Sequence, residues 1–220
     1  MADVLTIARR NMIKGQLMPV GVRDERLLHA FEVVPRDRFA PSHAPSLAYA
    51  DMSLSTDGSE QMLAPQAVGR LLEEVKLEPH EKVLYLGGGG YGAALSGYLA
   101  REVIGVLATD TCVRTARKVL EDLEIFNVVL VAAPWQDGMP AFAPYDVILV
   151  EGALSSLPDS WVGQLPEEGR VAWYHYQGAG RPAVATLSVY CRGQPSVLTP
   201  FEASVPRLAG DLDLKRGFQL

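Results

Sequence analysis

The stretch VLYLGGGGYGAAL, residues 83–95, decides the fold class. It combines a strand that is apolar on both faces, a turn of four glycines and a helix start. Such a strand suits a parallel sheet that is covered on each side. Gly87, Gly89 and Gly92 satisfy the pattern G-x-G-x-x-G, which permits a tight turn and lets a ligand approach backbone N–H groups. The stretch therefore predicts a ligand-binding turn, with a purely structural turn as the alternative.

Strand and helix patterns alternate from residue 82 onward. This alternation predicts an α/β fold with an open, doubly wound and mostly parallel sheet, whose ligands bind at the carboxyl ends of the strands. The last two strands form a terminal pair. The expected strands are 82–87, 102–108, 127–133, 145–153, 169–176 and 185–192, and the expected helices are 91–100, 109–125 and 158–165.

The first 76 residues are helical in character. Helices are expected over 3–18, 23–34 and 64–77, with Pro35 ending the second and Pro65 in the first turn of the third. The buried stripe of the third helix would be Val68, Leu71, Leu72 and Val75. Between the second and third helices, residues 39–62 carry prolines and hydroxyl side chains with little periodicity. They predict an ordered surface loop.

Composition excludes several classes of protein. The 220 residues are 48% hydrophobic and carry a net charge of −6, with scattered arginines, so a nucleic-acid partner is not expected. No apolar run is long enough to cross a membrane, and Arg9 and Arg10 interrupt any signal peptide, which favours a cytoplasmic protein. Cys112 and Cys191 lack metal-ligand spacing, so neither a metal site nor a disulfide framework is expected.

A ribose-binding carboxylate is missing from its usual place. In glycine-turn folds an acidic residue about 20 positions on accepts hydrogen bonds from ribose hydroxyls. Here that position is Leu107, and the nearest carboxylate is Asp110. A buried hydroxyl left unpaired costs about 1–3 kcal/mol. The turn alone therefore leaves ligand binding and a structural role equally open.

Beyond the turn, nearly the whole chain resembles the protein-L-isoaspartate O-methyltransferase family, in a divergent bacterial branch that keeps EGA after the fourth strand. The set of matching stretches is specific to this family, because the N-terminal VPRDRF…AY module is not general to methyltransferases. The matching stretches are VVPRDRF (33–39), LAYADMSL (47–54), APQAV (64–68), KVLYLGGGGYGAAL (82–95), NVVLV (127–131), APYDVILVEGA (143–153), LPDSWVGQLPEEGRVA (157–172) and PFEASVPRL (200–208).

The resemblance implies a Rossmann-like methyltransferase fold with S-adenosylmethionine (SAM) as cofactor. It also implies methylation of isoaspartyl carboxylates in damaged proteins, which would be the partners. The chain would form one domain, residues 1–220, with a substrate-side helical segment (1–76), a Rossmann-like core (77–192) and a C-terminal extension (193–220). A carboxylate is already a nucleophile at neutral pH, so proximity and exclusion of water suffice for this chemistry.

Candidate site residues follow from the same resemblance. On the cofactor side they are Gly87, Gly88, Gly89, Gly90, Asp110 and Trp135, and on the substrate side Tyr49, Asp51, Gln61 and Leu63. Glu151 follows a strand end on the ligand side, which would bring it towards the pocket, but a surface or hydrogen-bonded structural role is favoured.

Four positions depart from the family pattern. Tyr85 stands where the first motif has an acidic residue, and one loop residue is absent before Tyr91. Leu107 stands in place of the acidic residue that binds the ribose. Ala133–Trp135 replace a G-D-G loop, and QMLAP (61–65) replaces T-I-S-Q-P. Because these changes gather at ligand loops, a catalytically inactive binding or scaffolding protein is the alternative function. A dinucleotide-dependent oxidoreductase is a third possibility that rests on G-x-G-x-x-G alone.

Overall fold

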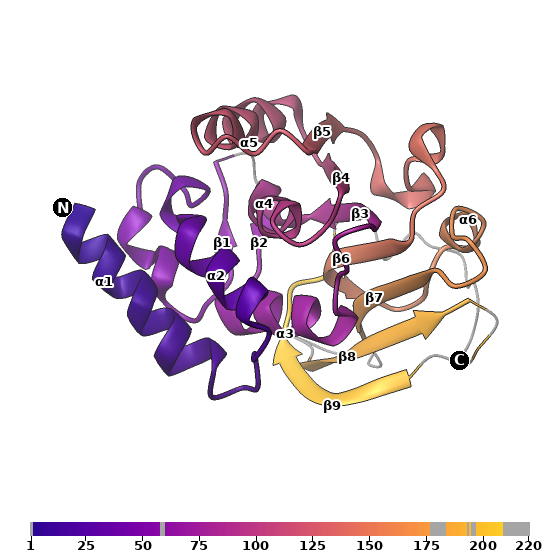
Figure 1. Cartoon of the computed structure of the whole chain (residues 1–220), viewed down its shortest axis with the longest axis horizontal. Helices are drawn as coiled ribbons and strands as arrows, with labels where there is room; N and C mark the ends of the chain where they lie inside the picture. Colours follow the sequence, from indigo (N-terminus) through magenta and orange to yellow (C-terminus); the bar gives the residue numbers. More distant parts are fainter. Residues whose placement is uncertain (1, 58–59, 177–183, 193, 195–196, 209–220) are drawn as a thin grey trace.

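A seven-stranded sheet of order β5-β4-β3-β6-β7-β8-β9 forms the centre of the computed structural model (Figure 1). The structure describes residues 2–57, 60–176, 184–192, 194 and 197–208. Five neighbouring strands are parallel, while β8 and β9 each run antiparallel to the preceding strand. The mostly parallel α/β sheet confirms the predicted fold class. The strands are β3 (Lys82–Gly87), β4 (Glu102–Leu107), β5 (Val128–Ala132), β6 (Val147–Leu154), β7 (Arg170–His175), β8 (Val184–Cys191) and β9 (Val197–Ser204).

The strand order reverses between β3 and β6. The chain runs outward from β3 through β4 to β5, then crosses to the other side of β3 to form β6 and β7. In open α/β sheets the crevice at this reversal, outside the carboxyl ends of the strands, is where ligands bind. Gly87 at the end of β3 pairs with Glu151 on β6, so both residues face this crevice.

The helices agree with the predicted pattern. Asp24 caps α2 by accepting a hydrogen bond from the Arg26 N–H, and Thr109 caps α5 by accepting one from the Cys112 N–H. The predicted stripe of α3 is buried at all four positions. The helices are α1 (Ala2–Met12, continued by a π-turn over Ile13–Leu17), α2 (Glu25–Val33), α3 (Pro65–Val75), α4 (Tyr91–Gly97), α5 (Asp110–Asp122) and α6 (Asp159–Val162).

The two faces of the sheet are covered unequally. The longer helices pack on one face, whereas the four-residue α6 lies on the other side (Figure 1). There Trp161 and Trp173 belong to the same buried cluster as Ile104 and Val106, and residues of the 3₁₀ turns Trp135–Asp137 and Pro140–Phe142 pack against this cluster. Both tryptophans are buried core residues. The helix expected over 158–165 is found there as the shorter α6, and the two 3₁₀ turns fill the rest of this layer.

Residues 39–62 are more structured than an ordered surface loop. They contain a 3₁₀ helix (Pro45–Tyr49) and a two-stranded hairpin of β1 (Leu54–Ser55) and β2 (Gln61–Met62). Ala48, Tyr49 and Met62 are buried. Apolar side chains spaced irregularly in the sequence therefore meet the core by tertiary packing, which periodicity could not reveal.

Three findings concern the described part of the chain. No helix in it is both long and apolar enough to cross a membrane. Cys112 and Cys191 are free thiols, and no group of His, Cys, Asp and Glu side chains in this part could hold a metal ion. The C-terminal stretch GDLDLKRGFQL lies outside the described residues.

Candidate active site

The glycine turn needs glycine for a steric reason. All four residues from Gly87 to Gly90 have positive φ, between 61° and 93°, a region that other residues enter only with strain. A Cβ on Gly88 would lie 1.9 Å from the Glu151 Oε2 atom, and one on Gly92 would lie 1.8 Å from the Tyr85 hydroxyl oxygen. The turn is therefore built tightly around these two side chains.

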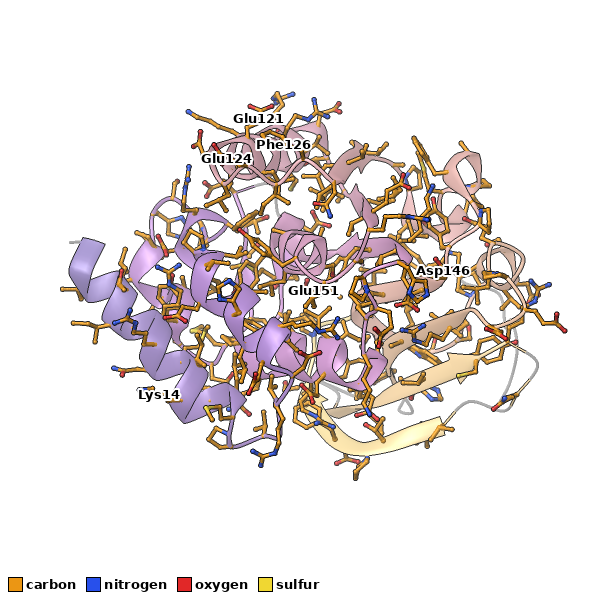
Figure 2. All side chains as sticks on the ribbon, viewed as in Figure 1. Lys14, Glu121, Glu124, Phe126, Asp146 and Glu151 are labelled. Atoms are coloured by element: carbon orange, nitrogen blue, oxygen red, sulfur yellow. The ribbon has the colours of Figure 1, made fainter. Side chains whose placement is uncertain are left out.

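Glu151 is the buried centre of the site. It lies inside β6, is 1% exposed, and Figure 2 places it in the middle of the molecule. Tyr85 donates a hydrogen bond from its hydroxyl to Glu151 Oε2 at 2.6 Å, and the Leu63 N–H donates to Oε1 at 2.9 Å. Burial raises the pKa of Glu151, opposed by these two hydrogen bonds and the positive charge of Arg36. A carboxylate therefore reaches the space beneath the glycine turn from β6.

Arg36 explains why the VPRDRF module accompanies this site. Its guanidinium is fully buried and donates hydrogen bonds to the carbonyls of Ala48, at 2.8 Å, and Leu63, at 2.5 Å. It also lies 5.0 Å from the centroid of the Tyr91 ring, within the range of a cation–π contact. One side chain therefore ties the N-terminal segment to the helix that follows the glycine turn.

A small pocket opens at the carboxyl ends of β3, β4 and β6. Its volume is about 100 Å³, well below the roughly 300–1,000 Å³ typical of small-molecule sites. Its walls combine the glycine turn, the end of β4, one aromatic and the last described residues. The lining residues are Glu60, Gln61, Gly87, Gly88, Val106, Leu107, Ala108, Ala133, Trp135, Glu151, Pro206, Arg207 and Leu208.

The segment Pro206–Leu208 narrows this pocket. It lies beside β6, where the Ala153 N–H donates to the Pro206 carbonyl and the Leu208 N–H donates to the Ala153 carbonyl, each at 3.0 Å. The Leu208 side chain comes within 3.4 Å of where a Gly87 Cβ would lie. Because its side chain closes the space over the turn, Leu208 limits what the pocket holds.

An open groove adjoins the pocket. Its volume is about 830 Å³, and it lies between the hairpin region and the end of β9. Gln61, Pro206 and Arg207 line both spaces and so form a shared wall. The Arg207 guanidinium lies 3.8 Å from the centroid of the Tyr176 ring, which also lines the groove. The groove is large enough for a chain segment.

The substrate-side candidates fall in three different places. Asp51 and Gln61 line the groove. Leu63 is fully buried, and it is its backbone N–H, bonded to Glu151, that belongs to the site. Tyr49 is 5% exposed and donates a hydrogen bond to Asp37, while burial raises its pKa, so it packs beneath the site.

The cofactor-side candidates are also divided. Gly87, Gly88 and Trp135 line the pocket, and Trp135 additionally packs edge-on against Trp161 at 5.8 Å. Gly89 and Gly90 complete the turn, Gly89 facing a neighbouring cleft beside α5. The structure places Asp110 at the exposed first residue of α5, outside the residues that line the pocket.

Sequence reasoning missed three contributors: Arg36, Glu60 and Arg207. The sequence predicts that Glu151 follows a strand end and has a surface or hydrogen-bonded structural role. It lies inside β6, where it is hydrogen-bonded as predicted and buried beside the pocket. Arg36 was visible only as part of a motif. Glu60 had no local signal at all, although it is 9% exposed and lines the pocket.

Fold and site together define a class of protein. A doubly wound sheet with a glycine turn at its strand-order reversal, next to a groove between residues 51–67 and the end of β9, is the arrangement of a Rossmann-like ligand-binding protein. The family model described as protein-L-isoaspartate(D-aspartate) O-methyltransferase matches residues 8–173. The chain therefore belongs to the protein-L-isoaspartate O-methyltransferase family.

Individual relatives agree with this assignment. A protein-L-isoaspartate O-methyltransferase from Koribacter versatilis is 37% identical over 164 residues, 74% of each chain. One from Picosynechococcus sp. is 36% identical over 171 residues, 77% of each chain. A solved protein-L-isoaspartate O-methyltransferase structure matches with a TM-score of 0.76 and 27% identity, covering 93% of this chain and 67% of the other. A Plasmodium falciparum structure in complex with S-adenosyl-L-homocysteine shares the fold at a TM-score of 0.74 and 16% identity, covering 91% of this chain and 97% of that one.

Proposed function

We propose that this protein transfers a methyl group from SAM to the stray carboxylate of isoaspartyl residues in damaged proteins or peptides. One observation carries the proposal: a pocket on the glycine turn and a groove of chain-like size share the wall formed by Gln61, Pro206 and Arg207. A cofactor on one side and a peptide on the other would meet at that wall. Family membership supports this reading over an oxidoreductase.

The pocket fits the nucleoside part of SAM in its chemistry. The turn presents backbone without side chains, Trp135 offers an aromatic face, and Glu60 offers a buried carboxylate. At about 100 Å³ the pocket is too small for a cofactor that needs roughly 300 Å³ or more. Binding therefore requires Leu208 to withdraw from the turn.

The chain's own residues orient the reactants and exclude water. When bound, SAM supplies a methyl group that a carboxylate oxygen accepts as the carbon–sulfur bond breaks, so no general base is needed. Arg207 is the cation at the shared wall, and its charge suits the carboxylate of the isoaspartyl side chain. The Tyr85–Glu151 pair holds the turn, and Arg36 holds the backbone of Leu63 against it.

The test has two stages. Isothermal titration with SAM and S-adenosylhomocysteine comes first, and micromolar binding is expected. Methylation of a peptide containing isoaspartate is then measured by mass spectrometry, with the same peptide containing aspartate as control. Methyl ester on the isoaspartyl peptide alone supports the proposal. A folded protein that binds neither ligand at millimolar concentration contradicts it and favours the inactive scaffolding alternative. A cytoplasmic location stays a prediction.

A further inference from the structure

The position expected to bind the ribose carries no polar group. Leu107 ends β4, is 1% exposed and lines the pocket with an apolar side chain. A ribose hydroxyl facing it would be buried without a partner, which weakens binding by about tenfold to a hundredfold. A nucleoside site at this turn therefore needs an acceptor from elsewhere in the chain.

Glu60 brings a carboxylate to the same place from a different element. It immediately precedes β2, and its backbone is held by Thr56, whose N–H donates to the Glu60 carbonyl at 2.7 Å and whose hydroxyl accepts from the Glu60 N–H at 3.2 Å. Its side chain reaches across to β4, where Oε2 accepts a long hydrogen bond, 3.4 Å, from the N–H of Ala108. Ala108 is the residue directly after Leu107.

The carboxylate keeps acceptor capacity for a ligand. An ionised carboxylate offers about four lone-pair sites, and the bond from Ala108 is long enough to be weak. The Gly89 backbone and the Cys112 thiol also approach Glu60, and Glu151 repels it from across the pocket. Glu60 is only 9% exposed and lines the pocket together with Gly88 and Leu107, so a ligand bound there lies beside its carboxylate.

We propose that Glu60 binds the ribose hydroxyls of the cofactor and so takes the role that an acidic residue at position 107 would have. This proposal rests on the proposed function, because it names the residue that holds SAM. It differs from the expectation for Asp110, which the structure places on the surface end of α5. The carboxylate comes to the pocket from the hairpin instead of from β4.

The experiment titrates S-adenosylhomocysteine and its 2′,3′-dideoxy analogue into the wild-type chain and variants by calorimetry. For the wild type we expect the analogue to bind about tenfold to a hundredfold more weakly. Glu60→Gln should weaken the binding of S-adenosylhomocysteine by a similar factor. It should also remove the difference in affinity between S-adenosylhomocysteine and the analogue. Glu60→Gln combined with Leu107→Glu should restore both, because the carboxylate returns to the pocket from β4.

Two variants serve as matched controls. Asp110→Asn removes the carboxylate nearest to Leu107 in the sequence, and Glu121→Gln removes an exposed glutamate that Figure 2 shows at the surface of α5. Both should bind S-adenosylhomocysteine as the wild type does. If Asp110→Asn instead loses the discrimination, the ribose site lies at Asp110 and the proposal for Glu60 is wrong.

The outcomes separate the two proposals. A wild-type chain that binds no S-adenosylhomocysteine overturns the proposed function and, with it, the role of Glu60. A wild type that binds both ligands equally well overturns the role of Glu60 alone, and this result needs no variant. The role of Glu60 is also overturned if the Glu60→Gln variant is folded, as judged by circular dichroism, and still binds S-adenosylhomocysteine more tightly than the dideoxy analogue. Should Glu60→Gln not fold, Glu60→Asp, with a shorter carboxylate, should fold and bind S-adenosylhomocysteine more weakly than the wild type.

Discussion

Tyr85 on β3 and Glu151 on β6 share a 2.6 Å hydrogen bond in the core, although 66 positions separate them in the sequence. Glu151 pairs in the sheet with Gly87, two residues beyond Tyr85, so the tyrosine hydroxyl reaches along the strand to the carboxylate. The bond fills the space under the glycine turn, where any side chain at Gly88 or Gly92 would collide with it.

Tyr85→Phe tests this bond directly. The change removes one of the two donors to a buried carboxylate, so the free energy of unfolding should fall by about 1–3 kcal/mol. Urea denaturation measures the loss. Tyr98→Phe is the matched control, because Tyr98 is 42% exposed and its change should stay within about 0.5 kcal/mol. Equal stability of the two variants would show that the Tyr85 bond contributes nothing net.

Gly88→Ala tests the fit of the turn. The new Cβ would meet the Glu151 carboxylate and force an alanine to a φ of 76°. Overpacking costs about 1–3 kcal/mol and the left-handed conformation about 1–2 kcal/mol more. We expect a large drop in melting temperature together with loss of S-adenosylhomocysteine binding.

Gly15→Ala provides the comparison for that variant. Gly15 lies in the π-turn after α1, and a Cβ there would have nothing within 4 Å. The alanine should leave the free energy of unfolding unchanged or raise it by about 0.4–1 kcal/mol, because it restricts the conformations of the unfolded chain. If Gly88→Ala behaves like Gly15→Ala, the turn is looser than the structure shows.

Leu208→Ala should open the cofactor pocket. The leucine side chain lies over Gly87 and Gly152 and narrows a space of about 100 Å³. Removing it lowers the cost of displacing the segment, so S-adenosylhomocysteine should bind about threefold to tenfold more tightly by calorimetry. Leu198→Ala, at an exposed position of β9, should change nothing. Weaker binding by Leu208→Ala would mean that the leucine is a wall of the bound state.

Arg207→Gln should act on the peptide substrate. The guanidinium lines the groove and the shared wall, where its charge would pair with the substrate carboxylate. A charge-assisted hydrogen bond of this kind is worth about 1.5–3 kcal/mol, so KM for an isoaspartyl peptide should rise at least tenfold. Arg207→Lys should recover part of the loss, whereas Arg23→Gln, on an exposed loop, should match the wild type. An unchanged KM in Arg207→Gln would remove the arginine from substrate recognition.

The stability of the protein should depend on pH through Glu60. Burial raises the pKa of its carboxyl to about 7, against about 4.3 in an unfolded chain. The folded state therefore holds the proton more tightly, and this contribution to stability is complete below about pH 4.3 and lost as the pH rises through about 7. Cys112 on α5, Glu151 on β6 and Arg207 at the pocket wall are the other titratable groups facing it.

Urea denaturation between about pH 5 and about pH 8 measures this slope. The free energy of unfolding should fall with rising pH in the wild type and fall less in Glu60→Gln. Part of the slope should remain in the variant, because burial raises the pKa of Glu151 in the same direction. Identical slopes in the two proteins would contradict the raised pKa of Glu60.

Most of the fold followed from local patterns. The apolar strand at 82–87 and the stripe of Val68 and Leu71 each depend on neighbours a few residues away, and both are found as predicted. The structure of residues 39–62 was harder to predict, because the buried Ala48 and Met62 follow no helical or strand period. Their burial is imposed by the sheet and helices that they cover.

The sequence by itself determined the order of strands and helices, the glycine turn and the family, because these are written in adjacent residues. Only the tertiary structure decided which side chains meet at the turn. Glu60 and Ala108 are 48 positions apart, and Tyr85 and Glu151 are 66 apart, yet both pairs are in contact. A carboxylate missing from one strand can be delivered by another, and which strand delivers it depends on the path of the whole chain through space.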